Sequence, residues 1–127
     1  MQPPVLVANQ EHRYWVERAQ GRSVVSGLND LVGFGKPAST PSLAEMWAVW
    51  RSVTAEADAY LDVLTPGMLA TYLVADGRPL SENVGTLLMR NIFHYWFHIG
   101  EAHAIRQILG HKNLPQFIGS LPPYGTE

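Results

Sequence analysis

Apolar residues recur every three or four positions across residues 43–64, and this spacing predicts an amphipathic helix with a wide apolar stripe. Charged residues such as Glu45 and Arg51 fall outside the stripe. Ser42 and Glu45 have the spacing of a capping box, so we expect the helix to begin at Ser42, with Thr40 as the alternative cap. The stripe consists of Leu43, Met46, Trp47, Trp50, Val53, Thr54, Ala57, Tyr60, Leu61 and Leu64.

The longest helical pattern runs from Ser81 to Leu109. Ser81 is a favourable N-cap, and Gly110 is expected to end the helix because glycine accepts the left-handed conformation found at many C-termini. One face of this helix is apolar at both ends and polar in its middle. Polar groups in a buried stripe need partners, since an uncompensated buried polar group costs about 1–3 kcal/mol. The face carries Leu87, Asn91, His94, His98, Glu101, Ile105 and Ile108.

A first helix is predicted from Pro3 or Pro4 to Gln20, because proline is tolerated in a first turn and a glycine follows Gln20. Residues 21–41 are rich in glycine and proline, which predicts a long connection with one short helical turn within residues 23–32. We interpret this segment as a crossover connection. Connections of this length in a compact domain also often carry function.

The remaining segments are short. Residues 71–74 favour β-structure but are too few and too isolated to make a sheet, and residues 76–79 predict a turn. Residues 111–127 predict an irregular tail that could fold back over the helices as a lid. The chain is therefore expected to be a single all-α domain, residues 1–127, with three long helices and short helical turns. The apolar residues of the tail that would make the lid are Leu114, Phe117, Ile118 and Leu121.

Composition narrows the class of protein. At 127 residues, 46% hydrophobic and 16% charged, the chain has enough apolar material for one core and is not disordered. A net charge of -2 without a basic run gives no footprint for nucleic acid. The absence of cysteine excludes disulfides and cysteine nucleophiles, and no apolar run reaches the roughly 18 residues of a membrane span. We expect a cytoplasmic protein that binds neither nucleic acid nor membrane.

His94 and His98 carry the most suggestive chemistry. Residues four apart on a helix lie one above the other, so both imidazoles can reach one point and bind a divalent ion such as zinc or nickel. Tyr95 stands where the helical zinc-protease motif has its glutamate, so that motif is absent. Glu101 lies on the same face and would either ligate the ion or hold His98 from behind. Hydrogen bonds would satisfy the same pair without metal.

Residues 87–110, LLMRNIFHYWFHIGEAHAIRQILG, resemble the last helix of the DinB/YfiT-like superfamily, in which two histidines four apart precede a glycine, a glutamine and an arginine-bearing turn. Residues 7–15, VANQEHRYW, are similar to the second helix of that family. Residues 43–69, which end in LTPGML, are similar to its third. The resemblance covers about residues 5–110, and it rests on the order and spacing of these motifs.

The resemblance implies a DinB-like up-and-down four-helix bundle with a long crossover loop, carrying a divalent metal on three histidines. His94 and His98 match two of the ligands. The third would fall at Leu6, which cannot bind metal, and His12 is the nearest substitute, although it lies about 240° further round the helix. Glu101 replaces the glutamine of the family.

The first helix of the family would precede residue 1 of this chain. Three long helices without it would leave an apolar groove exposed. The family members are often dimeric. We therefore expect self-association, most simply as a homodimer.

Three hypotheses of function follow. The first is a DinB-like metal-dependent enzyme of the thiol-dependent transferase, isomerase or hydrolase type, acting on a small-molecule substrate. The second is a degenerate, metal-free member that binds a small molecule or a protein, and Leu6 favours it. The third is a plain helical interaction module whose groove is filled by a partner.

Overall fold

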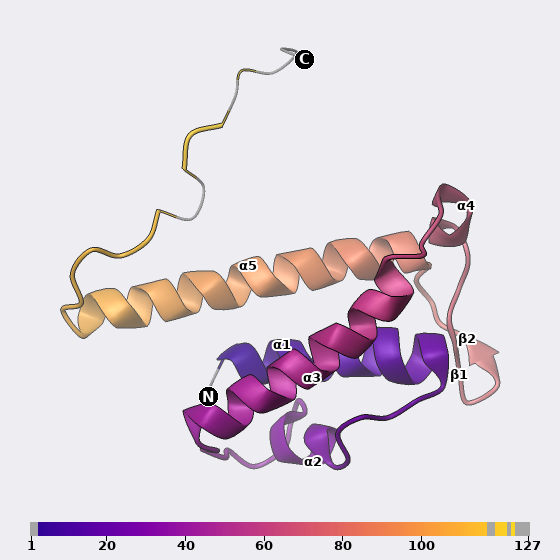
Figure 1. The fold of residues 1–127 in the computed structure, drawn as a ribbon, viewed down its shortest axis with the longest axis horizontal. Helices are drawn as coiled ribbons and strands as arrows, with labels where there is room; N and C mark the ends of the chain where they lie inside the picture. The colour runs from indigo at the N-terminus through magenta and orange to yellow at the C-terminus, as the bar shows by residue number, and fades with distance from the viewer. Residues whose placement is uncertain (1–2, 117–118, 122, 124–127) are drawn as a thin grey trace.

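The computed structural model describes residues 3–116, 119–121 and 123, and this part of the chain is mostly helical. Three long helical segments dominate the described residues, and the longest, α5, extends beyond the other two (Figure 1). The first of them packs against both α3 and α5. In chain order the elements are α1 (Pro3–Glu11), η1 (His12–Arg18), α2 (Leu28–Val32), α3 (Leu43–Leu61), α4 (Pro66–Leu69), β1 (Val74–Ala75), β2 (Arg78–Pro79) and α5 (Val84–Ile108).

Within the described residues, none of the helices combines the length and the apolar character that crossing a lipid bilayer requires.

The three predicted long helices are confirmed, and their ends have identifiable causes. At the start of α3, the Ser42 hydroxyl accepts a hydrogen bond from the Glu45 N–H at 3.3 Å, and the Glu45 carboxylate accepts one from the Ser42 N–H at 2.9 Å. This is the predicted capping box. Gly21 and Gly110 follow the first and last helices with φ of 65° and 73°, the left-handed conformation expected of them.

The predicted start of α5 is wrong by two residues. Asn83, not Ser81, caps the helix, and its side-chain oxygen accepts a hydrogen bond from the Thr86 N–H at 2.9 Å. The cause is the hairpin that directly precedes the helix. The Leu80 N–H donates to the carbonyl of Leu73 at 2.8 Å, which holds the chain extended at this point and delays the first helical turn.

The prediction that residues 71–74 make no sheet is also wrong. Val74–Ala75 pairs with Arg78–Pro79 in a two-stranded antiparallel sheet. The two residues between the strands have positive φ, 50° at Asp76 and 73° at Gly77. An Asp-Gly pair is well suited to this tight hairpin turn, because both of its central residues must be left-handed.

The tail does not form the predicted lid in the part that the structure describes. Leu121 is 74% exposed, and Figure 1 shows the tail leading away from the helices. Leu114 is half-buried. Phe117 and Ile118, the other two residues of the predicted lid, lie outside the described residues.

The hydrophobic core forms where the first helix crosses α3 and α5. Trp15 is its largest member, is fully buried, and stacks on Tyr60 with ring centroids 5.9 Å apart. A smaller cluster joins α2 to α3. The buried residues of the main cluster are Trp15, Val16, Ala57, Val84 and Leu87, and those of the smaller cluster are Leu28, Met46 and Val53.

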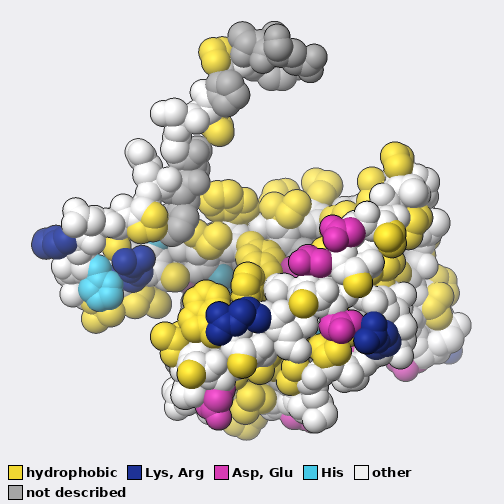
Figure 2. All heavy atoms as spheres, in the orientation of Figure 1, with side chains coloured by type: hydrophobic (Ala, Val, Ile, Leu, Met, Phe, Trp, Pro, Cys, Tyr) yellow, Lys and Arg dark blue, Asp and Glu magenta, His cyan; other side chains and the backbone are white. Residues whose placement is uncertain are grey.

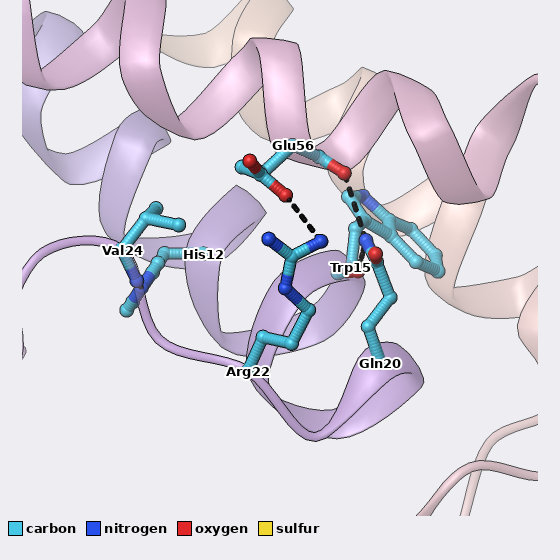
Figure 3. A network of polar contacts seen from close by, with 6 residues as sticks. All are labelled: His12, Trp15, Gln20, Arg22, Val24 and Glu56. Atoms are coloured by element: carbon cyan, nitrogen blue, oxygen red, sulfur yellow. Dashed lines mark hydrogen bonds and ion pairs between the residues drawn. The ribbon is translucent and has the colours of Figure 1, made fainter.

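The first helix changes its winding in the middle. Its segment His12–Arg18 is a π-helix, which sequence periodicity did not predict. Just after this segment, the Gln20 amide donates to the carbonyl of Trp15 at 2.7 Å and to the carbonyl of Glu56 at 2.8 Å (Figure 3). Arg22 pairs with the Glu56 carboxylate at 2.8 Å. These contacts tie the rewound segment to α3. Irregular windings of this kind are frequent at functional sites.

Candidate functional site

His94 and His98 meet at one point, as their spacing predicts. Their Nε2 atoms lie 2.9 Å apart, and their ring centroids are 4.5 Å apart in an edge-on arrangement. His98 is buried and His94 is half-buried. The Glu101 carboxylate, one turn further along α5, lies 2.7 Å from His98 Nδ1. Two imidazoles and a carboxylate therefore form a short polar chain on the inner face of α5.

Glu101 fixes the proton arrangement of the pair. Because its carboxylate accepts from His98 Nδ1–H, the other ring nitrogen of His98 keeps its lone pair and faces His94. In the hydrogen-bonded form, His94 Nε2–H donates to that lone pair. Burial, and next the neighbouring His98, lower the pKa of His94, so its neutral ring is favoured. Neutral imidazoles are the form that binds metal.

The two rings fit two positions of a metal shell. Nitrogens bound to one zinc ion at about 2.0–2.1 Å in a tetrahedral shell lie about 3.3 Å apart. The observed separation of 2.9 Å is only slightly shorter, so a small opening of the two rings would admit an ion. The carboxylate of Glu101 behind His98 is the second-sphere partner that metal-binding histidines usually have.

A third protein ligand is not brought to this pair. Among the described residues, no group of three or more His, Cys, Asp or Glu side chains gathers in a way that could hold a metal ion. His12 is buried elsewhere: its Nε2 accepts a hydrogen bond from the Val24 N–H at 3.2 Å, and its Nδ1 lies 3.5 Å from Glu17 (Figure 3). Leu6 lines the same cavity as the two histidines and offers no donor atom.

A second buried polar group is centred on Glu11 of the first helix, which contacts α5 one turn before the histidines. The Glu11 carboxylate, only 6% exposed, accepts a hydrogen bond of 2.6 Å from the Asn91 amide and one from Tyr95. Burial raises the pKa of Glu11. The hydrogen bonds from Asn91 and Tyr95 lower it in part, and the negative charge of Asp58 raises it. Burial and the charge of Glu11 raise the pKa of Tyr95 beyond its usual range. This carboxyl joins the first helix to α5.

Glu11→Gln should raise the free energy of unfolding at pH 8 more than at pH 5. Because the pKa of Glu11 is raised in the folded state, the folded protein holds this proton more tightly than the unfolded chain does. The free energy of unfolding therefore falls as the pH rises from the pKa of Glu11 in the unfolded chain towards its pKa in the folded protein. Each tenfold change in acidity corresponds to about 1.4 kcal/mol. Glutamine removes this cost and can also donate to the side-chain oxygen of Asn91, which has no partner among the described residues.

Urea unfolding of both proteins at the two pH values, at one protein concentration, measures this difference. An equal effect of the substitution at pH 5 and pH 8 would show that Glu11 titrates alike in the folded and unfolded states.

His94 and His98 form part of the wall of a cavity of about 510 Å³, which is within the usual size of small-molecule sites. Three segments distant in sequence enclose it: the first helix, the connection before α3, and α5. Leu6 and Arg13 come from the first helix, and Phe34 comes from the connection. The long connection therefore shapes the candidate site.

Several residues of this cavity were not singled out from the sequence. Asn9, Gln10 and Arg13 all line it, and together with Leu6 they recur at the spacing of one helical face. That spacing was a usable signal. The place of Phe34 was not predictable, because nothing in a glycine-rich connection fixes its path.

Comparison of the chain with models of protein families, with curated proteins and with solved structures gives no match.

Proposed function

We propose that the chain is a DinB-like metal-dependent enzyme acting on a small molecule bound in the cavity. One observation carries the proposal: two imidazole nitrogens converge to 2.9 Å at the wall of a cavity large enough for a substrate. The sequence resemblance to the DinB/YfiT-like superfamily supports it. The reaction types compatible with it are thiol-dependent transfer or isomerisation and hydrolysis.

The residues of the chain have separate roles in this proposal. His94 and His98 would hold the ion, which would be zinc or nickel. Glu101 is a positioning residue, because it orients His98 from the far side of the ring. A bound ion supplies a Lewis acid and a coordinated water or thiol of lowered pKa. Since the chain has no cysteine, the thiol of a transfer reaction would come from a co-substrate.

The proposal predicts metal in protein purified without a histidine tag. We expect about one divalent ion per chain by elemental analysis, falling at least tenfold in His94→Ala and in His98→Ala. Glu101→Gln should weaken zinc binding by about 10–100-fold, because the amide is a poorer partner for His98 Nδ1–H. His111→Ala, a histidine outside the pair, is the matched control and should keep its metal. Substoichiometric metal that does not change in either variant would contradict the proposal.

A metal-free binding module is the second candidate, and two placements favour it. Leu6 occupies the cavity wall where the resemblance expects a third histidine, and His12 is engaged with Val24. In this form the histidine pair is satisfied by its own hydrogen bond and by Glu101. The cavity would then bind a small molecule without ion chemistry. Absence of metal together with ligand binding would select this candidate.

We also propose that two copies of the chain associate through α5. Its outer side carries Met89, Ile92, Phe93 and Trp96, which are 48–63% exposed. At about 100° per residue these four lie on the side of the helix opposite to His98. Hydrophobic side chains follow α5 in Figure 2. A helix that is apolar on opposite sides is normally covered on both, so the outer side favours a partner.

The occupant we propose is a second copy, because a two-fold axis would place the same apolar patch on both chains. Four side chains of this size at about half exposure leave roughly 400 Å² of apolar surface. This is about half of the ~800 Å² per partner of a standard interface, so we expect a small and weak dimer.

A further inference from the structure

Two cationic side chains line the cavity although the chain carries a net charge of -2. Arg13 and Lys36 line it, and none of the described residues that line it is an aspartate or glutamate. The Lys36 ammonium is neutralised by the Asp30 carboxylate at 3.0 Å. The Arg13 guanidinium makes no ion pair with the described residues, so it offers a free positive charge to a ligand.

Buried polar atoms of the cavity residues also lack partners among the described residues. They are Asn9 Oδ1, Gln10 Nε2 and His94 Nδ1. Asn9 is only 6% exposed, and all three residues line the cavity. A buried polar atom without a partner is costly, and a ligand can supply the missing bond. Gln10 offers a donor, three residues before Arg13, whereas Asn9 offers an acceptor.

The rest of the wall is apolar. Leu6, Leu31 and Phe97 contribute aliphatic and aromatic surface from three different segments. Phe34 also lines the cavity, and its side chain is fully exposed in the free protein. Its ring, between Gly33 and Gly35, is therefore available to pack on an apolar ligand.

We infer that the cavity binds a small organic acid with an apolar body. Its carboxylate lies on Arg13 with a further hydrogen bond from Gln10. A hydroxyl beside the carboxylate donates to Asn9 Oδ1, and the apolar body packs on Phe34 and the apolar wall. The inference names the substrate class of the proposed function and rests on the same cavity, but its recognition elements do not include the metal.

Calorimetric titration of the full chain with 3-phenyllactate and with its uncharged primary amide tests the inference, first with a chelator and then after loading with zinc. The acid should bind at least about tenfold more tightly than the amide in both conditions, because charge-assisted hydrogen bonds are the stronger ones. Arg13→Gln should weaken binding of the acid about 10–100-fold and leave the amide unchanged. Arg13→Lys should restore part of the loss.

Arg51→Gln is the matched control, because Arg51 lies on α3 over the Trp47 ring and away from the cavity lining. Equal binding of acid and amide, no binding of either, or acid binding unchanged in Arg13→Gln would overturn the inference. Acid binding that requires zinc and ignores Arg13 would overturn it too, while leaving the metal-dependent function in place. Arg13-dependent binding by a protein that takes up no zinc when zinc is offered would support the inference and contradict the metal-dependent function.

Discussion

Replacing Trp15 with alanine is expected to lower the free energy of unfolding by about 3–5 kcal/mol, the largest loss of any single substitution in this core. Trp15 is fully buried, stacks on Tyr60 and contacts the residues that join the first helix to α3 and α5. Its removal would leave a large cavity at the one place where all three long segments meet. Chemical unfolding followed by circular dichroism measures the change.

Two further substitutions keep this prediction testable if Trp15→Ala does not fold. Trp15→Phe should cost much less, because the ring stacking is kept and the indole N–H has no partner among the described residues. Trp47→Ala is the matched control on α3, since Trp47 is 39% exposed. A loss of about 3–5 kcal/mol in Trp47→Ala would place the core elsewhere.

The second large effect concerns self-association. The double substitution Phe93→Glu and Trp96→Glu should raise the dimer dissociation constant by at least about 100-fold, because it removes two aromatic anchors and would bury two unpaired charges. The stability of the single chain should change little, since both side chains are exposed in it. Sedimentation equilibrium over a range of protein concentrations gives the constant directly.

Two controls separate the interface from general effects of charge. Ala55→Glu adds the same charge at an exposed position of α3 and should leave the dimer intact. Gly100→Leu should weaken the dimer without harming the single chain, because a Cβ at this position meets nothing within 4 Å. A parent chain that is monomeric at about 100 μM, or a double variant that still dimerises, would contradict this interface. A monomer that pairs with a different protein through α5 would support the interaction module instead.

Local sequence signals predicted where the helices lie well, but they predicted poorly how contacts with other segments change the helix ends. The Ser42–Glu45 capping box and Gly110 act within a few residues, so the chain around them decides the outcome. Ser81 had the right chemistry for a cap, but the hydrogen bond from Leu80 to Leu73 moved the start of α5 to Asn83. That bond continues the hairpin of residues 74–79, a pairing that the sequence did not predict.

In the candidate site too, local spacing predicted some features and contacts between segments decided the others. His94 and His98 share one helix, so their convergence followed from helical spacing alone. Arg13 and Phe34 reach the same cavity from other segments. Helical spacing could place Arg13 on one face with Leu6, but no local pattern could show that this face meets α5, and none could place Phe34. The bond from Val24 to His12 likewise decides which way that imidazole points. Relations between segments therefore required the folded structure.

The central claim is that His94 and His98 share one ion at the wall of the cavity. A crystal of the untagged protein soaked in zinc, measured on both sides of the zinc absorption edge, tests it directly. One anomalous peak between the two Nε2 atoms, about 2 Å from each, is the predicted result. Absence of a peak there, with the two rings still in hydrogen-bond contact, would contradict the claim.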